Sequence, residues 1–150
     1  MITDYQNEYQ EVGAVYFDSV HFLASLFSTP GEIDARAPVP RDFSPWKARC
    51  ESRRPFLYKK GTRVTGFLEM DACGHIDGLY AAFSHQDSTA PLLEHAIAVA
   101  RFRGTNRALF VEALAASEGL YRKFGFKPIE VVLAHRSGHG FASVRMCKFL

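Results

Sequence analysis

The sequence has little of what marks membrane, secreted or metal-stapled proteins. No apolar run approaches the roughly 20 residues that a membrane-spanning helix needs, and the polar, acidic start is unlike a signal or transit peptide. The three cysteines, Cys50, Cys73 and Cys147, are far apart and form no Cys-x-x-Cys pair. This pattern favours reduced thiols in a cytoplasmic protein over a disulfide framework or a zinc site.

Basic residues are absent before Arg36, where the chain has six acidic residues. After Tyr121 the balance reverses, with six basic residues and one acidic residue. The ordinary interpretation is two solvated faces, and the alternative is an acidic end for a cationic ligand and a basic end for an anionic one. The net charge of +2 is too small to indicate a nucleic-acid partner.

The length and composition predict one globular domain over residues 1–150. A chain of 150 residues buries about 70% of its unfolded surface, so it needs no disulfide or metal to fold. Hydrophobic residues make up 47% of the chain, and the 13 Phe and six Tyr predict a bulky core.

The spacing of apolar residues predicts three helices and six strands in mixed order. The helices are expected over 7–27, from a cap at 87–89 to Gly104, and over 116–124. The strands are expected over 55–59, 63–70, 75–83, 107–113, 129–135 and 142–149. The proline-rich stretch 29–45 predicts a loop with a short helical piece at 32–36. This order predicts an α/β (α+β) fold with a mixed, mostly antiparallel central sheet flanked by helices.

Two chemistries are excluded by what the motifs lack. His75 and Asp77 are metal-binding residue types, and strand alternation places both on one face. No third or fourth ligand stands nearby in the sequence, whereas metal sites need three or four, so no metal site is expected. Ser-His-Asp hydrolysis is excluded because the chain has no Gly-x-Ser-x-Gly motif.

Two segments are stronger candidates for function. The third predicted strand leads directly to a helix N-terminus, where unpaired backbone N–H groups bind phosphates. Further on, Leu120-Tyr-Arg-Lys-Phe-Gly-Phe126 places a phenol on a short helix just before a strand. Considered by itself, that tyrosine is more typical of packing than of proton transfer.

The stretch Leu120-Tyr-Arg-Lys-Phe-Gly-Phe126 resembles the Leu-Tyr-Glu-Lys-Leu-Gly-Phe motif of the GNAT superfamily, the acyl-CoA-dependent N-acyltransferases. The predicted order of elements is similar as well. Other stretches resemble a small bacterial subgroup of that superfamily, among them Val64-Thr-Gly-Phe-Leu-Glu and Gly74-His-Ile-Asp-Gly-Leu-Tyr80. The resemblance extends from about Val12 to Lys148 and implies the GNAT fold.

The chain departs from the family pattern at the segment that resembles the pyrophosphate loop. Family members have Gln/Arg-x-x-Gly-x-Gly/Ala there, and its backbone N–H groups hold the coenzyme pyrophosphate. Gln86 matches the first position, but the loop is about two residues shorter and has no glycine. Every residue there carries a Cβ, which hinders close approach of a phosphate, and Asp87 adds a negative charge. In the acceptor region, Ser28 and Arg36 stand where the subgroup has Tyr and Trp.

The resemblance implies an N-acyltransferase that moves an acetyl group from acetyl-CoA to a primary amine by direct attack in a ternary complex. Tyr121 would protonate the leaving thiolate. Glu69, His75 and Asp77 are the candidate bases, with Glu69 favoured and a water relay as the alternative. Residues of the third strand and the following loop would hold the coenzyme: Leu79, Tyr80, Ala81, Gln86, Asp87, Ser88, Thr89 and Ala90. Ser28 and Arg36 would contact the acceptor, a small molecule or a peptide.

A second hypothesis belongs to another class of function. The chain could be a GNAT-fold binding or interaction module that has lost coenzyme binding and turnover, because fold alone does not establish activity. The glycine-free loop favours this module, whereas Tyr121 in its otherwise standard motif favours the enzyme. In both cases we expect a cytoplasmic protein, able to form a homodimer, with no metal, membrane or nucleic-acid partner.

Overall fold

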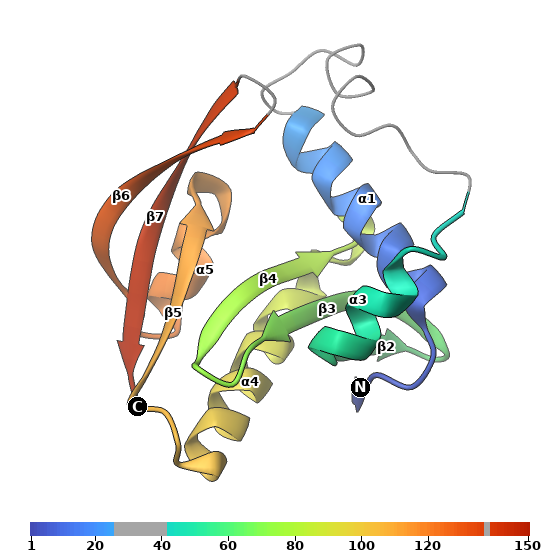
Figure 1. The fold of residues 1–150 in the computed structure, drawn as a ribbon, viewed down its shortest axis with the longest axis horizontal. Helices are drawn as coiled ribbons and strands as arrows, with labels where there is room; N and C mark the ends of the chain where they lie inside the picture. Colours follow the sequence, from blue (N-terminus) through green and yellow to red (C-terminus); the bar gives the residue numbers. More distant parts are fainter. Residues whose placement is uncertain (26–41, 137–138) are drawn as a thin grey trace. The chain divides into compact units, whose positions relative to one another are not determined.

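A computed structural model describes residues 1–25, 42–136 and 139–150 (Figure 1). In these residues a seven-stranded sheet has the order β1-β2-β3-β4-β5-β7-β6. The strands are β1 (Ile2–Asp4), β2 (Phe56–Lys60), β3 (Arg63–Met70), β4 (His75–Ala81), β5 (Ala108–Leu114), β6 (Lys127–Arg136) and β7 (His139–Phe149). The helices are α1 (Tyr9–Ser25), α3 (Trp46–Arg53), α4 (Thr89–Arg103), α5 (Ala115–Lys123) and the 3-10 helix η1 (Phe83–Ser88).

The sheet is mixed. Its pairs β1–β2, β2–β3, β5–β7 and β6–β7 are antiparallel, whereas β4 and β5 are parallel. The predicted α+β fold with a mixed, mostly antiparallel sheet and flanking helices is thereby confirmed. The chain divides into two compact units, of which unit 1 contains residues 1–69 and 79–92, and unit 2 contains residues 70–78 and 93–150.

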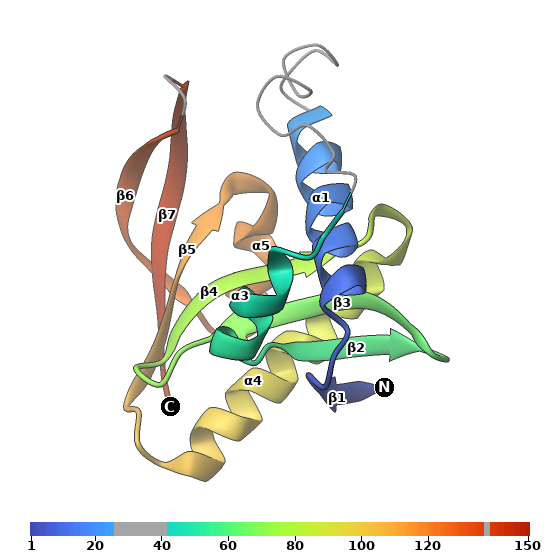
Figure 2. The ribbon, with the colours of Figure 1, turned by 45° about the vertical axis from the view of Figure 1, so that its right-hand side comes forward.

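Unit 1 has an aromatic core. Helices α1 and α3 lie side by side (Figure 2). Their buried residues pack with those of β2 and β3 in one cluster: Tyr5, Val12, Val15, Trp46, Cys50, Leu57, Val64 and Phe67. The ring of Tyr80 completes this cluster, with its centroid 5.0 Å from those of Phe67 and Tyr16. Burial raises the pKa of the Cys50 thiol to about 11, so this cysteine serves as a core residue.

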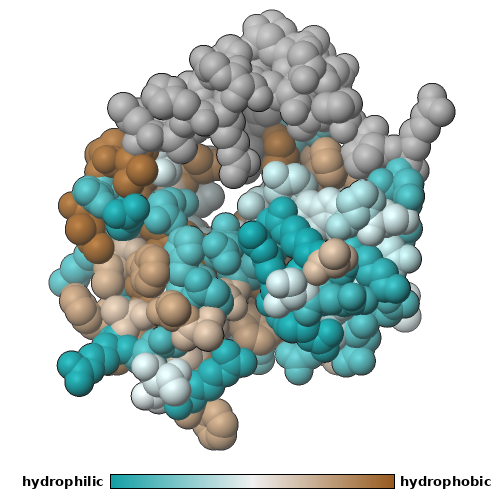
Figure 3. Space-filling view, in the orientation of Figure 1, coloured by the Kyte–Doolittle hydropathy of each residue, from teal (hydrophilic) through white to brown (hydrophobic). Residues whose placement is uncertain are grey.

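Unit 2 is organised around β5. Along this strand Leu109, Val111 and Ala113 are buried and alternate with half-buried residues. Tyr121 of α5 and Phe126 are also buried, and their rings meet edge to face at 5.3 Å. Strand β6 lies at the edge of the sheet. Its Ile129 and Val131 are 61% and 71% exposed, and hydrophobic residues gather on the surface over β6 and β7 (Figure 3).

The sequence did not predict two elements of the fold, because both are short. Strand β1 has three residues and is defined only by its pairing with β2. Helix α3 has eight residues and buries only Trp46 and Cys50, so it has too few turns for a periodic pattern. The helical piece predicted at 32–36 lies outside the described residues.

The third strand was predicted too long. The prediction extended it to Phe83, but β4 ends at Ala81 and a 3-10 helix follows. The physical reason is a side chain from another element. The carboxylate of Asp18 on α1 accepts the backbone N–H of Phe83 at 2.6 Å, so this amide cannot continue a ladder. In the described residues, no helix is long and apolar enough to cross a membrane.

Gly66, in β3, marks a place where unit 1 has no space for a side chain. A Cβ at this position would lie 2.9 Å from the Cβ of Ser88 and 3.1 Å from the carbonyl oxygen of Tyr80. We expect Gly66→Ala to lower the free energy of unfolding by about 1–3 kcal/mol, because backbone would have to shift. Gly119→Ala, in α5 with nothing near its Cβ, is the control and should raise stability by up to ~1 kcal/mol. Urea titrations measure both, and an unchanged Gly66→Ala midpoint would contradict this account.

Candidate functional sites

The segment that leads from β4 into α4 is folded against itself. Three of its backbone amides donate within the protein: Phe83 to Asp18 at 2.6 Å, His85 to the Ala82 carbonyl at 2.8 Å, and Thr89 to the Gln86 carbonyl. Pro91, in the first turn of α4, has no N–H to offer. These four residues therefore offer no unpaired amide to a phosphate, unlike the free N–H groups that make helix N-termini anion sites.

Side chains fix the same segment in place. Ser88 is fully buried, with its hydroxyl 2.8 Å from that of Thr65. The amide of Gln86 donates to the carbonyls of Ala81 and Ala82 at 3.3 and 3.2 Å. Of the residues expected to hold the coenzyme, Ser88 and Gln86 are thus engaged within unit 1, and Tyr80 and Ala81 belong to its packed interior. Leu79, Thr89 and Ala90 are half-buried.

Asp87 keeps an exposed carboxylate on this segment, but a cation accompanies it. The ammonium of Lys60, at the end of β2, lies 2.6 Å from Asp87 Oδ2. Its hydrogen bond lowers the pKa of Asp87 below the usual value. The local charge is therefore an ion pair rather than the lone negative charge that the sequence suggested.

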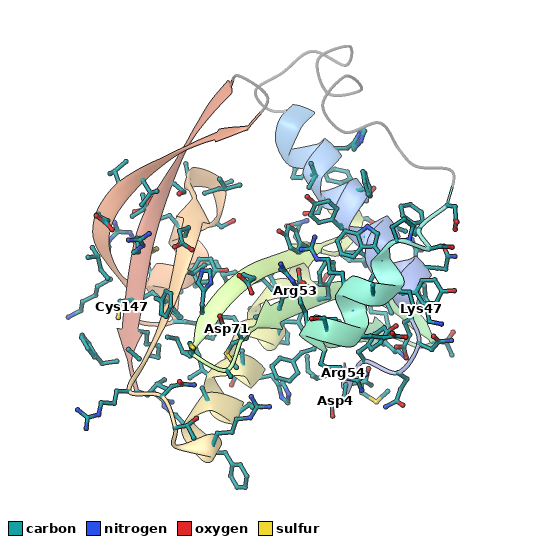
Figure 4. The ribbon with its side chains drawn as sticks, viewed as in Figure 1. Asp4, Lys47, Arg53, Arg54, Asp71 and Cys147 are labelled. Atoms are coloured by element: carbon teal, nitrogen blue, oxygen red, sulfur yellow. The ribbon has the colours of Figure 1, made fainter. Side chains whose placement is uncertain are left out.

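Glu69, the favoured candidate base, is buried under two guanidinium groups. Arg49 donates to both of its oxygens, at 2.6 and 3.1 Å, and Arg53 donates to Oε2 at 3.3 Å. Both arginines project from α3, where Figure 4 labels Arg53. The Arg49 guanidinium also lies 4.3 Å from the ring centroid of Trp46. The Glu69 carboxylate, 2% exposed, thus joins α3 to β3, and accepting a proton would weaken three hydrogen bonds.

His75, the first residue of β4, is the centre of a polar cluster in unit 2. Its Nε2 lies 2.6 Å from Glu112 Oε2, and its Nδ1 lies 3.1 Å from Asp77 Oδ1. The ring stacks on Phe110 with a centroid distance of 4.8 Å and an angle of 14°. His75 and Asp77 are therefore brought together as strand alternation predicted, and both nitrogens of the imidazole face carboxylates.

Glu112 and Arg145 are the residues of this cluster that sequence reasoning missed. Arg145 of β7 donates to Glu112 Oε1 at 3.3 Å and also pairs with Glu130 of β6. Burial alone would raise the pKa of Glu112, but His75 and Arg145 outweigh it and hold the pKa below the usual range. The alternation of β5 could have indicated Glu112 as a partly buried acid. Its neighbours follow only from the strand order.

Tyr121, the candidate acid, is 3% exposed on α5. Its backbone carbonyl accepts the N–H groups of Phe124 and Phe126, which closes the helix before β6. The packed ring is compatible with either role considered from the sequence, core residue or proton donor. Glu69 belongs to unit 1, whereas His75, Asp77 and Tyr121 belong to unit 2. The acceptor candidates Ser28 and Arg36 lie outside the described residues.

Solved structures of N-acetyltransferases share the fold of this chain. A GCN5-related N-acetyltransferase from Rhodopseudomonas palustris superimposes with a TM-score of 0.84 at 20% identity, over 100% of this chain and 95% of the other. A ribosomal-protein-alanine N-acetyltransferase from Brucella melitensis gives 0.73 at 18% identity, over 100% and 99% of the two chains. The PaiA N-acetyltransferase from Thermoplasma acidophilum, in complex with coenzyme A, gives 0.71 at 15% identity, over 100% and 99%. The GNAT fold expected from the sequence is confirmed.

At the level of sequence, no protein-family model and no curated protein matches this chain.

The ion pairs of Glu69 predict a structural effect. Glu69→Gln should lower the free energy of unfolding by about 2–3 kcal/mol, less than the roughly 3–5 for a fully buried pair, because Arg49 is 31% exposed. Glu51→Gln is the control, since Glu51 makes only a surface pair with Lys47 at 4.0 Å. It should change stability by less than about 0.5 kcal/mol. Denaturant unfolding followed by circular dichroism measures both, and equal stabilities of the two variants would refute the role given to Glu69.

Proposed function

We propose that this chain transfers an acetyl group from acetyl-CoA to a primary amine. The observation that carries the proposal is the GNAT fold, shared along the whole chain with solved N-acetyltransferases, one of which contains coenzyme A. When bound, acetyl-CoA supplies the acetyl group as a thioester whose carbonyl carbon an amine can attack.

The β4–α4 segment fits the coenzyme phosphates through a side-chain cation rather than through a backbone cradle. The amides of Phe83, His85 and Thr89 are engaged, so they do not supply the cradle that the GNAT loop implies. Lys60 supplies a positive charge there, at present opposite Asp87. Lys60 would hold the phosphates, and the Asp87 carboxylate would compete with them for it.

Tyr121 has the role of the acid in this proposal. A phenol with an ordinary pKa near 10 stays protonated at neutral pH and can transfer its proton to a thiolate, whose thiol has a pKa near 8.5, as the bond breaks. The buried ring on α5, held against Phe126, would keep the hydroxyl in one orientation.

Water is the proton acceptor that the surroundings of the candidate bases favour. Glu69 is held by Arg49 and Arg53, and both nitrogens of His75 face the carboxylates of Asp77 and Glu112. A water relay can carry a proton from the substrate ammonium to bulk solvent without breaking these contacts, which frees the amine lone pair to attack the thioester. Glu69 then acts as a structural carboxylate.

The second candidate, a GNAT-fold binding or interaction module, rests on one observation. The amides of Phe83, His85 and Thr89 are bonded within the protein, so a phosphate would lose their contribution to its binding energy. Coenzyme binding separates the two candidates.

Asp87→Asn should strengthen acetyl-CoA binding about fivefold, because removing a negative charge about 4 Å from a phosphate is worth about 1 kcal/mol in water. Lys60→Gln should weaken it by a similar factor. Asp4→Asn, which removes the same charge from β1, is the control and should leave the affinity unchanged. Isothermal titration calorimetry measures all three. If millimolar acetyl-CoA gives no binding heat and shifts the melting temperature no more than ATP does, the proposed acetyltransferase activity is wrong and the binding module is the better hypothesis.

Tyr121→Phe keeps the ring and removes only the hydroxyl. If Tyr121 is the acid, turnover should fall by ~100-fold or more, while the free energy of unfolding changes by less than about 1 kcal/mol. Tyr58→Phe is the control, because it makes the same change at a half-buried tyrosine of β2. It should leave turnover intact. Release of free thiol from acetyl-CoA in the presence of an amine gives the rate, and urea titration gives the stability. Normal turnover in Tyr121→Phe would assign proton donation to water.

A further inference from the structure

We infer that the β3–β4 turn and the start of β4 form a binding site for a divalent transition-metal ion, with Asp71, His75 and Asp77 as ligands. The site lies within unit 2, and Figure 4 labels Asp71 in the turn. One ligand atom from each of the three residues lies within 4.8 Å of the others. The proposal does not depend on acetyl transfer, because none of the three residues has a part in it.

The distance between two of these ligand atoms suits a metal centre. His75 Nδ1 and Asp77 Oδ1 are 3.1 Å apart. Two ligands about 2.1 Å from one ion lie roughly 3.0 Å apart at 90° and 3.4 Å apart at the tetrahedral angle. Asp71 Oδ1 accepts the N–H groups of Cys73 and His75 at 2.8 and 2.9 Å, which fixes this carboxylate in the turn. The ligand oxygen of Asp71 lies within 4.8 Å of the other two ligand atoms, so the turn has to close slightly around a bound ion.

The imidazole is oriented by residues outside the ligand set. Glu112 Oε2 lies 2.6 Å from Nε2 and is placed to accept an N–H from it, while Phe110 stacks on the ring and Arg145 holds the second oxygen of Glu112. In a neutral imidazole the remaining nitrogen, Nδ1, is an acceptor. The imidazolium form donates from Nδ1 to the Asp77 carboxylate, and the neutral form leaves that lone pair beside Asp77 Oδ1, where both atoms can bind one cation. Histidines that bind metals commonly donate their other N–H to a carboxylate in this way.

The donor set indicates the class of ion. One imidazole and two carboxylates carry a charge of −2, which a divalent cation neutralises. Mixed nitrogen and oxygen ligands favour Zn²⁺, Co²⁺ or Mn²⁺ over Mg²⁺ and Ca²⁺, which prefer oxygen alone. Three protein ligands leave at least one position for water. The sequence argument against a metal considered His75 and Asp77 alone, whereas this proposal adds Asp71 from the turn before the strand as the third ligand.

Calorimetric titration of the EDTA-treated full chain with Zn²⁺, and with Co²⁺ followed by visible absorption, tests the site. We expect one ion per chain, with no comparable binding of Mg²⁺. His75→Gln and Asp77→Asn should each weaken binding at least 100-fold. Glu112→Gln should weaken it about 10–100-fold while keeping one ion per chain, since it only orients the imidazole.

Two control variants separate this site from adventitious binding. Cys73→Ser removes the exposed thiol of the same turn, and His95→Gln removes a histidine of α4 outside the cluster. Both should bind as the original chain does. Circular dichroism shows whether each variant folds. If His75→Gln does not fold, Asp71→Asn, at an exposed position, is a second variant that removes a ligand. Absence of Zn²⁺ and Co²⁺ binding, or binding that survives the loss of Asp71, His75 and Asp77 in turn, overturns the proposal.

Discussion

A carboxylate that leaves water has to be met by cationic or N–H groups, and this requirement shapes both units of the protein. In unit 1, Glu69 of β3 is met by two arginines, which holds the short helix α3 in place. Asp18 of α1 accepts the amide of Phe83, which ends β4. In unit 2, Glu112 gathers His75 and Arg145 from the neighbouring strands. The polar clusters are thus the points where separate elements are joined.

The need to pair buried polar groups affects the chemistry of the protein more than it affects the fold. Solved N-acetyltransferases share the GNAT fold with this chain at 15–20% identity, so the pattern of buried apolar residues is enough to keep the architecture. The segment between β4 and α4 occupies the expected place in the fold, but its Phe83, His85 and Thr89 amides are bonded within the protein. A side-chain cation can meet a phosphate there, and Lys60 already pairs with Asp87 of this segment.

His75, in the polar cluster of unit 2, can be interpreted in more than one way. In the sequence, His75 and Asp77 form a pair of candidate bases. In the structure, Glu112 lies against one imidazole nitrogen and Asp77 against the other, and Asp71 is close to both His75 and Asp77. The rigid strands β4 and β5 hold these groups, which is the kind of support that a metal ligand needs.

The sequence by itself determined the elements with regular spacing and the family of folds. Helix α1, the hairpin of β2 and β3, and β5 follow from local periodicity, and the motif around Tyr121 indicated the superfamily. Only the tertiary structure decided what surrounds each polar residue. Arg49 is 20 positions from Glu69, and Glu112 is 37 from His75. Such partners are chosen by strand order and helix packing, because a charge responds to its neighbours in space, and local spacing does not record them.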